Sequence, residues 1–293
     1  TLKGRNISED DQEMLQMKFD KMYTTKDIYT IYNWMLDDCD CDLLPEVPYE
    51  KRKLPYEDVF PMLYLKYRLS GGNSTHKNIK HLVIDEMQDY TYLQYTILES
   101  LFHCRMTILG DRAQTLDTKQ QDVLRFLPKL LGREIRTIEI KKSYRNTLEI
   151  ARYAEKISGV SDLELLDRHG KEVVEKTFNT DTELLDELVC HLKCPGDFET
   201  AALITTTEEE AFDLSRLLKL RGINVSYVDR NSSAFKKGLT VTTFYLAKGL
   251  EFDQVFALRG AKENPLKNQA EYICATRALH ELYVYEIADS LAK

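Results

Sequence analysis

The stretch Leu82-Val83-Ile84-Asp85-Glu86-Met87-Gln88-Asp89 decides the fold class of this sequence. A short continuous apolar run is typical of a strand buried on both faces of a parallel sheet. Ligands of such sheets lie beyond the carboxyl ends of the strands, and Asp85 and Glu86 stand at that end. Asp85 can hold Mg²⁺ through water, and Glu86 can orient or deprotonate an attacking water. Two solvated acids at a strand end are the alternative.

Apolar runs of this kind recur along the chain and alternate with amphipathic stretches. We expect helices at 146–158, where Asn146 is the candidate cap, and at 207–221, where Thr207 and Glu210 form a capping box. The expected strands are 82–84, 106–109, 135–140, 201–204, 225–228, 239–244, 255–258 and 282–287. This alternation predicts an α/β fold of parallel sheets flanked by helices, with a boundary between two such units near 141–147.

The N-terminal part has a different pattern. Residues 8–69 are expected to be mainly helical, since Ser8 with Asp11 resembles a helix start, and a loop is expected at 71–74. The sequence therefore predicts three parts, which are a helical segment at 1–75, one α/β unit at 76–142 and a second at 143–293.

Three further segments carry polar residues that suit a phosphate ligand. Gln114 follows another expected strand and can hydrogen-bond a phosphate oxygen. Arg145 is a bidentate phosphate donor at the start of an expected helix, where anions are favoured, and Tyr144 beside it can stack on a base. Arg277, expected near the start or middle of a helix, can act as an arginine finger on a γ-phosphate. Taken singly, each has an ordinary alternative: a strand exit, a helix cap with a basic flank, and a surface arginine.

Composition limits the classes of protein. Of the 293 residues 43% are hydrophobic and 30% charged, which excludes a disordered or collagen-like chain. Lys and Arg number 40 and Asp and Glu 48, a net charge of −8 that argues against a general polyanion-binding surface and leaves room for a local basic groove. No run approaches the roughly 20 apolar residues of a membrane span, and the polar first residues are no signal peptide. We expect a cytoplasmic protein without a membrane partner.

The six cysteines are too few for a disulfide scaffold. Cys39 and Cys41 lie in an acidic run, and Cys190, His191 and Cys194 share one expected helix. No second ligand pair stands at zinc-knuckle spacing, so reduced thiols are favoured over a metal site.

Taken in order, five segments resemble the motifs of superfamily 1 helicases of the UvrD/Rep type. These segments are 85–89, 110–114, 143–146, 243–252 and 272–278. The phrases at 245–253 and 274–282 are most similar to the HelD branch, whose members bind RNA polymerase and help to recycle it.

The resemblance implies two RecA-like lobes with ATP and Mg²⁺ between them. In this family the first acid of the pair holds Mg²⁺, the second activates water, and positive donors from both lobes neutralise the transferred phosphoryl group when the cleft closes. The residues that it assigns are Glu86, Gln114, Arg145 and Arg277 to catalysis, Asp85 to Mg²⁺, and Asp85, Tyr144, Lys248 and Glu251 to the nucleotide.

Two of the departures from the family pattern bear directly on function. No G-x-x-x-x-G-K-[ST] loop (Walker A) occurs in the sequence. The resemblance implies that this loop lies upstream of Thr1, that the sequence is a fragment with an incomplete first lobe, and that 1–75 belongs to that lobe or to an inserted arm. The missing Walker A segment is thus an expected partner. The family's stacking Trp after the third motif is also absent, since Trp34 is the sole Trp.

Three functions remain open. The first is a fragment of an ATP-dependent superfamily 1 helicase or translocase that acts on single-stranded or duplex DNA. The second is a HelD-like ATPase that binds and remodels RNA polymerase, which the acidic balance and the absent Trp favour. The third is a non-enzymatic interaction domain in which every segment has its ordinary structural role.

Overall fold

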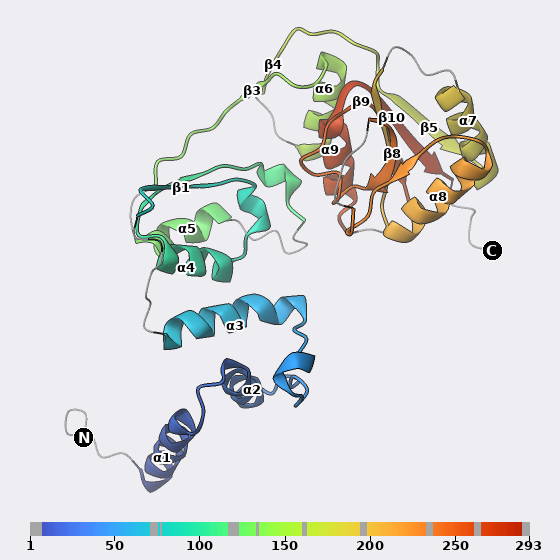
Figure 1. Cartoon of the computed structure of the whole chain (residues 1–293). Coiled ribbons are helices and arrows are strands. Elements are labelled where there is room, and N and C mark those ends of the chain that lie inside the picture. Colours follow the sequence, from blue (N-terminus) through green and yellow to red (C-terminus); the bar gives the residue numbers. More distant parts are fainter. Residues whose placement is uncertain are drawn as a thin grey trace. The chain divides into compact units, whose positions relative to one another are not determined.

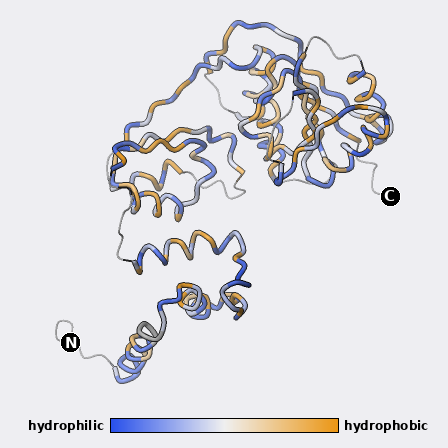
Figure 2. The backbone as a smooth tube through the Cα atoms, viewed as in Figure 1, coloured by the Kyte–Doolittle hydropathy of each residue, from blue (hydrophilic) through white to orange (hydrophobic). Residues whose placement is uncertain are grey.

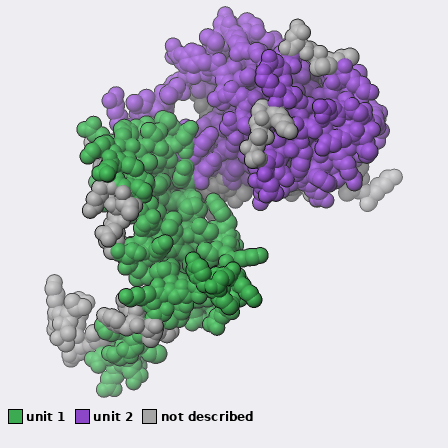
Figure 3. All heavy atoms as spheres, viewed as in Figure 1, with its two compact units in different colours: residues 1–85, 90–109, 123–134 green, residues 86–89, 110–122, 135–293 purple. Residues whose placement is uncertain are grey.

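The computed structural model forms two compact units (Figures 1 and 3). Unit 1 comprises Thr1–Asp85, Tyr90–Leu109 and Val123–Glu134, and unit 2 comprises Glu86–Asp89, Gly110–Asp122 and Ile135–Lys293. Two segments from the N-terminal side of the expected boundary, 86–89 and 110–122, thus group with unit 2. The residues described are 8–70, 76, 78–116, 123–132, 135–159, 163–193, 198–232, 237–260 and 265–288. The expected loop at 71–74 and Cys194 lie outside them.

Unit 2 is built on a six-stranded sheet of order β5-β10-β9-β6-β8-β7 in which every neighbouring pair is parallel. Its strands are β5 (Val174–Phe178), β6 (Thr200–Thr205), β7 (Ser226–Tyr227), β8 (Gly238–Thr243), β9 (Phe252–Arg259) and β10 (Ala278–Ile287). The predicted α/β class, a parallel sheet flanked by helices, is confirmed, and the arrangement is consistent with a RecA-like lobe.

Helices cover both faces of this sheet (Figure 1). They are α6 (Leu148–Ser158), α7 (Asp181–Lys193), α8 (Glu208–Leu220) and α9 (Lys267–Arg277). Successive strand side chains alternate between the faces, so Ile204 packs in the cluster that contains residues of α6 and α9, whereas Leu203 packs in the cluster with α7 and α8. Both side chains are almost fully buried, which contributes about 1.5–3 kcal/mol each to stability. Two-sided burial explains why a central strand such as β6 carries a continuous apolar run.

Unit 1 contains the helical N-terminal segment and a small sheet. Its elements are α1 (Glu9–Thr24), α2 (Ile28–Asp38), η1 (Tyr49–Lys51), α3 (Tyr56–Leu69), β1 (His81–Ile84), α4 (Tyr92–Leu101), β2 (Arg105–Ile108) and α5 (Val123–Leu131). As expected, Ser8 caps α1 and accepts a hydrogen bond from the Asp11 amide. Strands β1 and β2 pair in parallel, and the hydrophobic residues of the chain are coloured orange in Figure 2.

Three local predictions were wrong. Residues 135–140 form no strand, and their Ile138 and Ile140 are 70% and 80% exposed with no strand beside them in the described ranges. An apolar alternation becomes a strand only where a partner strand satisfies its backbone. The short strand β3 (Lys142–Ser143) follows instead and pairs with β4 (Glu164–Leu165).

The other two corrections concern helix ends. Thr147, not Asn146, occupies the N-cap position of α6, because Asn146 is buried and its amide is used elsewhere. Arg277 is the last residue of α9, not a residue near its start or middle, and β10 begins directly after it.

Candidate functional site

The acidic end of β1 continues into unit 2 through a strained residue. Glu86 has a backbone φ of 51°, in the left-handed region that costs a non-glycine residue about 1–3 kcal/mol. Its carboxylate Oε2 accepts a hydrogen bond from Nε2 of Gln88 at 2.6 Å. Gln88 lies in the 3₁₀ turn η2 (Met87–Asp89) and is 8% exposed. The buried amide of Gln88 thus holds the Glu86 carboxylate beside η2.

Gln88 also links this turn to the next predicted segment. Its Oε1 accepts the backbone N–H of Asp111 at 3.1 Å. The close approach requires a glycine at position 110, because a Cβ on Gly110 would lie 2.5 Å from Oε1 of Gln88 and 2.7 Å from the backbone N of Met87. Gly110 therefore serves packing here.

The carboxylate of Asp111 is the branch point of the network. Asp111 precedes the 3₁₀ turn η3 (Arg112–Gln114), and its Oδ1 accepts the backbone N–H of Ala113 at 3.0 Å. Its Oδ2 accepts Nε2 of Gln114 at 3.0 Å and the hydroxyl of Tyr272 at 2.9 Å. Burial and then the Asp111 charge raise the pKa of Tyr272, so this hydroxyl keeps its proton and donates it.

Gln114 meets Arg277 on the other side. Nη2 of Arg277 donates to Oε1 of Gln114 at 3.1 Å and to Oγ1 of Thr276 at 3.2 Å, and Nη1 donates to the Leu250 carbonyl at 3.3 Å. Arg277 is only 2% exposed, and its Nε has no hydrogen-bond partner in the described part of the chain. A buried, incompletely paired guanidinium is costly and needs an explanation.

Several charges act on Arg277. Burial lowers its pKa and the positive charge of Arg145 lowers it further, whereas the carboxylates of Glu86, Glu251 and Asp111 raise it. Charged side chains from four separate segments of the sequence therefore lie within electrostatic range of the Arg277 guanidinium.

Lys248 ties a further segment to the acidic turn. Its Nζ lies 2.6 Å and 2.8 Å from the two carboxylate oxygens of Asp89 and donates to the Gln114 carbonyl at 3.0 Å. The Lys248 side chain is 9% exposed and that of Asp89 37%. The lysine therefore holds η2 and η3 to the segment that leads into β9.

The remaining predicted residues lie nearer the surface. Nε of Arg145 lies 2.8 Å from Oε1 of Glu251, and both side chains are nearly half exposed. Tyr144 is 63% exposed. Arg168 donates to the Arg145 carbonyl at 3.1 Å and supports this segment.

The structure thus joins part of the predicted set by hydrogen bonds. Glu86, Gln114 and Arg277 belong to one hydrogen-bonded chain, and Lys248 is attached to it at the Gln114 carbonyl. Arg145 pairs with Glu251, within electrostatic range of Arg277. Asp85 is exposed and is the last residue of the first segment of unit 1. Sequence reasoning missed Gln88, Asp89, Asp111 and Tyr272, although each lies inside a segment that it singled out.

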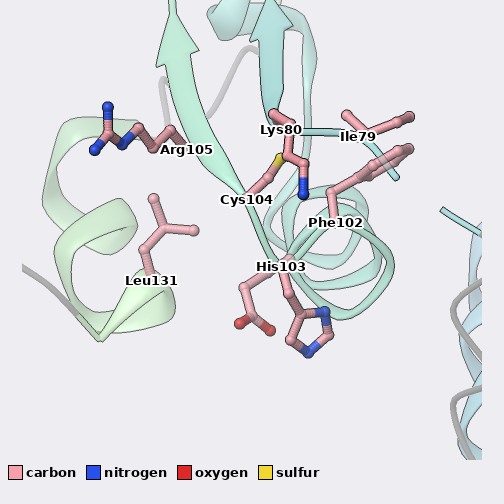
Figure 4. A pocket seen from close by; sticks show the side chains of 8 residues that line it. Ile79, Lys80, Phe102, His103, Cys104, Arg105 and Leu131 are labelled. Carbon is pink, nitrogen blue, oxygen red and sulfur yellow. The ribbon is translucent and has the colours of Figure 1, made fainter. Parts of the chain in front are cut away.

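Unit 1 contains a hollow of its own (Figure 4). It has a volume of about 510 Å³ and its lining includes Lys80, His103 and Arg105, at the amino ends of β1 and β2. Asp85 follows the opposite end of β1, and none of the predicted site residues is among those that line the hollow.

Two further types of feature are missing from the described residues. No group of three or more His, Cys, Asp or Glu side chains there is placed to hold a metal, and Cys39, Cys41 and Cys190 are exposed free thiols. No helix in the described ranges is both long and apolar enough to cross a bilayer.

No protein-family model and no curated protein matches the chain. Among solved structures, the C-terminal domain of a possible DNA helicase from Lactobacillus plantarum WCFS1 is 25% identical, with a TM-score of 0.40, over 50% of this chain and 88% of that domain. The helicase of PRRSV is 17% identical with a TM-score of 0.41, over 72% of this chain and 36% of the viral protein. The arterivirus nonstructural protein 10 (helicase) is 16% identical with a TM-score of 0.41, over 69% and 38%. Similarities at this level are partial, so any function has to come from the chemistry of the site.

Proposed function

We propose that the protein is part of an ATP-driven nucleic-acid motor of the superfamily 1 type. ATP would bind where the acidic turns η2 and η3 meet the arginine-bearing end of α9. Its hydrolysis would drive movement along a nucleic acid, with DNA as the expected partner.

The observation that carries the proposal is the hydrogen-bonded chain from Glu86 to Arg277. Each of its steps, through Gln88, Asp111 and Gln114, is between 2.6 and 3.1 Å. A carboxylate that can orient and deprotonate a water molecule is thereby connected by hydrogen bonds to a buried guanidinium that can bind a phosphoryl group. Phosphoryl transfer depends on positioning and on positive charge more than on covalent chemistry, and this arrangement supplies both.

The donor set also suits an anionic ligand and Mg²⁺. Nε of Arg277 is a buried donor without a partner among the described residues, which an oxygen of a bound anion can satisfy. Opposite charges attract more strongly in such a desolvated place than in water. The adjacent carboxylates of Asp85 and Glu86 are the oxygen ligands that Mg²⁺ prefers, and the ion would supply charge neutralisation at the phosphates.

In this proposal each residue has a defined task. Glu86 orients the attacking water and takes its proton at a carboxylate oxygen. Arg277 stabilises the charge that develops on the transferred phosphoryl, and Gln114 orients that arginine. Lys248 keeps the acidic turn in place through Asp89. Arg145 and Glu251 lie at the exposed side, where the nucleotide would enter.

The proposal also sets a requirement. No G-x-x-x-x-G-K-[ST] loop occurs in the 293 residues, so another segment must cradle the phosphates. Activity is therefore to be measured in the longest natural chain that contains this sequence.

The decisive variant is Glu86→Gln, which keeps the size of the side chain and removes its basicity. We expect ATP hydrolysis to fall at least 100-fold, in line with the roughly 10²–10⁴-fold contribution of a general base, while the affinity for ATP changes less than about threefold. Glu209→Gln, which neutralises an exposed carboxylate in the first turn of α8, should leave both unchanged.

Two outcomes contradict the proposal. One is a correctly folded longest natural chain, with this wild-type sequence, that hydrolyses no ATP in the presence of single-stranded DNA. The other is unchanged turnover in Glu86→Gln. Hydrolysis stimulated by RNA polymerase and not by DNA would replace the nucleic-acid motor with a polymerase-directed ATPase.

A further inference from the structure

We propose that Asp111, held by the hydroxyl of Tyr272, is a positioning residue that fixes the side-chain amide of Gln114 against Arg277. The inference rests on the proposed function, in which Arg277 meets the transferred phosphoryl, and adds a device that controls it. Neither Asp111 nor Tyr272 would touch the nucleotide.

Chemistry alone fixes the orientation of the Gln114 amide. A carboxylate only accepts hydrogen bonds and a guanidinium only donates them. The amide therefore directs Nε2 to Asp111, at 3.0 Å, and Oε1 to Arg277, at 3.1 Å. A flipped amide would face a carboxylate with an oxygen and a guanidinium with an NH₂ group, losing both bonds.

The carboxylate that imposes this orientation is itself fixed. Oδ1 of Asp111 accepts the Ala113 amide at 3.0 Å, and Oδ2 accepts the Tyr272 hydroxyl at 2.9 Å beside Gln114. Tyr272 and Arg277 both belong to α9, so the connections Tyr272–Asp111–Gln114–Arg277 form a closed ring between one helix and η3. The ring attaches Gln114 to α9 at two points, directly through the Arg277 guanidinium and indirectly through Asp111 and the Tyr272 hydroxyl.

Removing one hydroxyl should open the ring without removing packing. In Tyr272→Phe, Oδ2 of Asp111 loses one of its two donors, so the carboxylate is held less firmly and the Gln114 amide that it binds becomes more mobile. Since the ground-state contacts of the nucleotide are untouched, kcat should fall about tenfold while KM for ATP stays within twofold. The matched control is Tyr285→Phe, because the Tyr285 hydroxyl is buried and has no hydrogen-bond partner in the described ranges.

The first test needs no nucleotide. In ¹⁵N-labelled protein, the Gln114 side-chain amide signal is identified by its loss in Gln114→Ala. We expect Tyr272→Phe to shift this signal and to speed its exchange with solvent, and Tyr285→Phe to do neither. An unchanged signal in correctly folded Tyr272→Phe overturns the inference. This readout stands even if the chain proves to hydrolyse no ATP, so the two proposals fail separately.

The second test separates positioning from general stability. Tyr272→Phe should lower kcat about tenfold in the wild type and less than twofold in a Gln114→Ala background, because its effect passes through Gln114. Equal losses in both backgrounds would show a merely structural role and overturn the inference. If Tyr272→Phe does not fold, Asp111→Asn replaces it, with the same two backgrounds and the same expectation.

Discussion

Lys248 and Asp89 lie 159 residues apart in the sequence and form a two-pronged ion pair, with Nζ 2.6 Å and 2.8 Å from the two carboxylate oxygens. The lysine is the more buried partner, with 9% of its side chain exposed against 37% for the aspartate. The pair attaches the acidic turn to the segment before β9. We therefore expect the loss of either partner to alter the position of Glu86, three residues before Asp89.

Lys248→Met, which keeps the length of the side chain, should destabilise the protein. It removes a charge-assisted bond and leaves Asp89 unpaired, and we expect a loss of about 1.5–3 kcal/mol, at the lower end because Asp89 is partly exposed. Urea unfolding of Lys248→Met, Asp89→Asn and the double variant gives the coupling energy of the pair. A coupling below about 0.5 kcal/mol would show that the pair contributes no stability.

Local features of this fold were predictable from the sequence. The Thr207–Glu210 capping box forms as expected, since both partners lie within one helical turn. The central strands β6, β8, β9 and β10 were recognisable because burial on two faces demands apolar residues, whereas the edge strand β5, with its mostly exposed residues, was not predicted. At Ile138 and Ile140 the same apolar pattern predicted a strand that does not form, because strand formation also requires a partner strand.

The site was predictable as a set of segments and not as a set of contacts. Gln114 and Arg277 stand 163 residues apart, and no local pattern states that an amide will face a guanidinium. Tyr272 and Asp111 were passed over for the same reason, because the hydrogen bond between them joins residues 161 positions apart. Asn146 resembled a helix cap because short polar residues favour that position, yet burial gave it different partners.

Gly110→Ala tests how closely η2 and η3 must approach. The added Cβ would lie 2.5 Å from Oε1 of Gln88 and from Cγ of Met87, so the Gln88–Asp111 bond must break or the turns must separate. We expect a lower melting temperature than in Gly159→Ala, where the glycine has a φ of 67° and no atom within 4 Å of the new Cβ. Gly159→Ala should cost about 1 kcal/mol from backbone strain alone. A smaller loss in Gly110→Ala than in this control would contradict the close packing.

Arg277→Lys tests the arginine with its charge retained. A lysine has no planar fork and cannot keep the bonds to Gln114 and to the Leu250 carbonyl together. We expect kcat for ATP hydrolysis to fall by about 10²-fold or more, in the direction of the 10³–10⁵ attributed to arginine fingers. Arg216→Lys, on the surface of α8, is the control. Turnover within threefold of the wild type would leave Arg277 as a structural residue.

The contacts of His169 with Glu149 and Asp167 should confer a pH-dependent stability. His169 lies 2.8 Å from Oε1 of Glu149 and 3.0 Å from Oδ1 of the exposed Asp167. Its bond to Glu149, and then the Asp167 charge, raise the pKa of His169. The bond to His169 and, after it, backbone hydrogen bonds lower the pKa of Glu149 to about 2. The histidine's contribution is complete below its ordinary pKa of about 6.5 and is lost as the pH rises through the raised value. The glutamate's contribution is complete above its ordinary pKa of about 4.3 and is lost as the pH falls toward 2.

The difference in melting temperature between the wild type and His169→Gln should therefore be largest near pH 5–6 and should shrink by pH 9. Above pH 6, the difference in melting temperature between the wild type and Glu149→Gln should also shrink as the pH rises, since this variant removes the carboxylate that pairs with the charged His169. A difference in melting temperature that grows as the pH rises would be opposite to this expectation and would exclude the His169–Glu149 pair as its source.

Asn146→Ala should destabilise unit 2 beside Arg277. Nδ2 of Asn146 donates to the carbonyls of Ala278, at 2.5 Å, and Ala275, at 3.3 Å, which flank the end of α9. Asn146 is 8% exposed, so alanine leaves buried carbonyl oxygens without this donor at a cost of about 1–3 kcal/mol. Urea unfolding measures the loss, and Asn179→Ala, at an exposed position, should change stability by less than about 0.5 kcal/mol. Asn146→Asp should be worse than alanine, because it directs a carboxylate oxygen at a carbonyl oxygen. Equal stability of Asn146→Asp and the wild type would mean that the amide does not hold the end of α9.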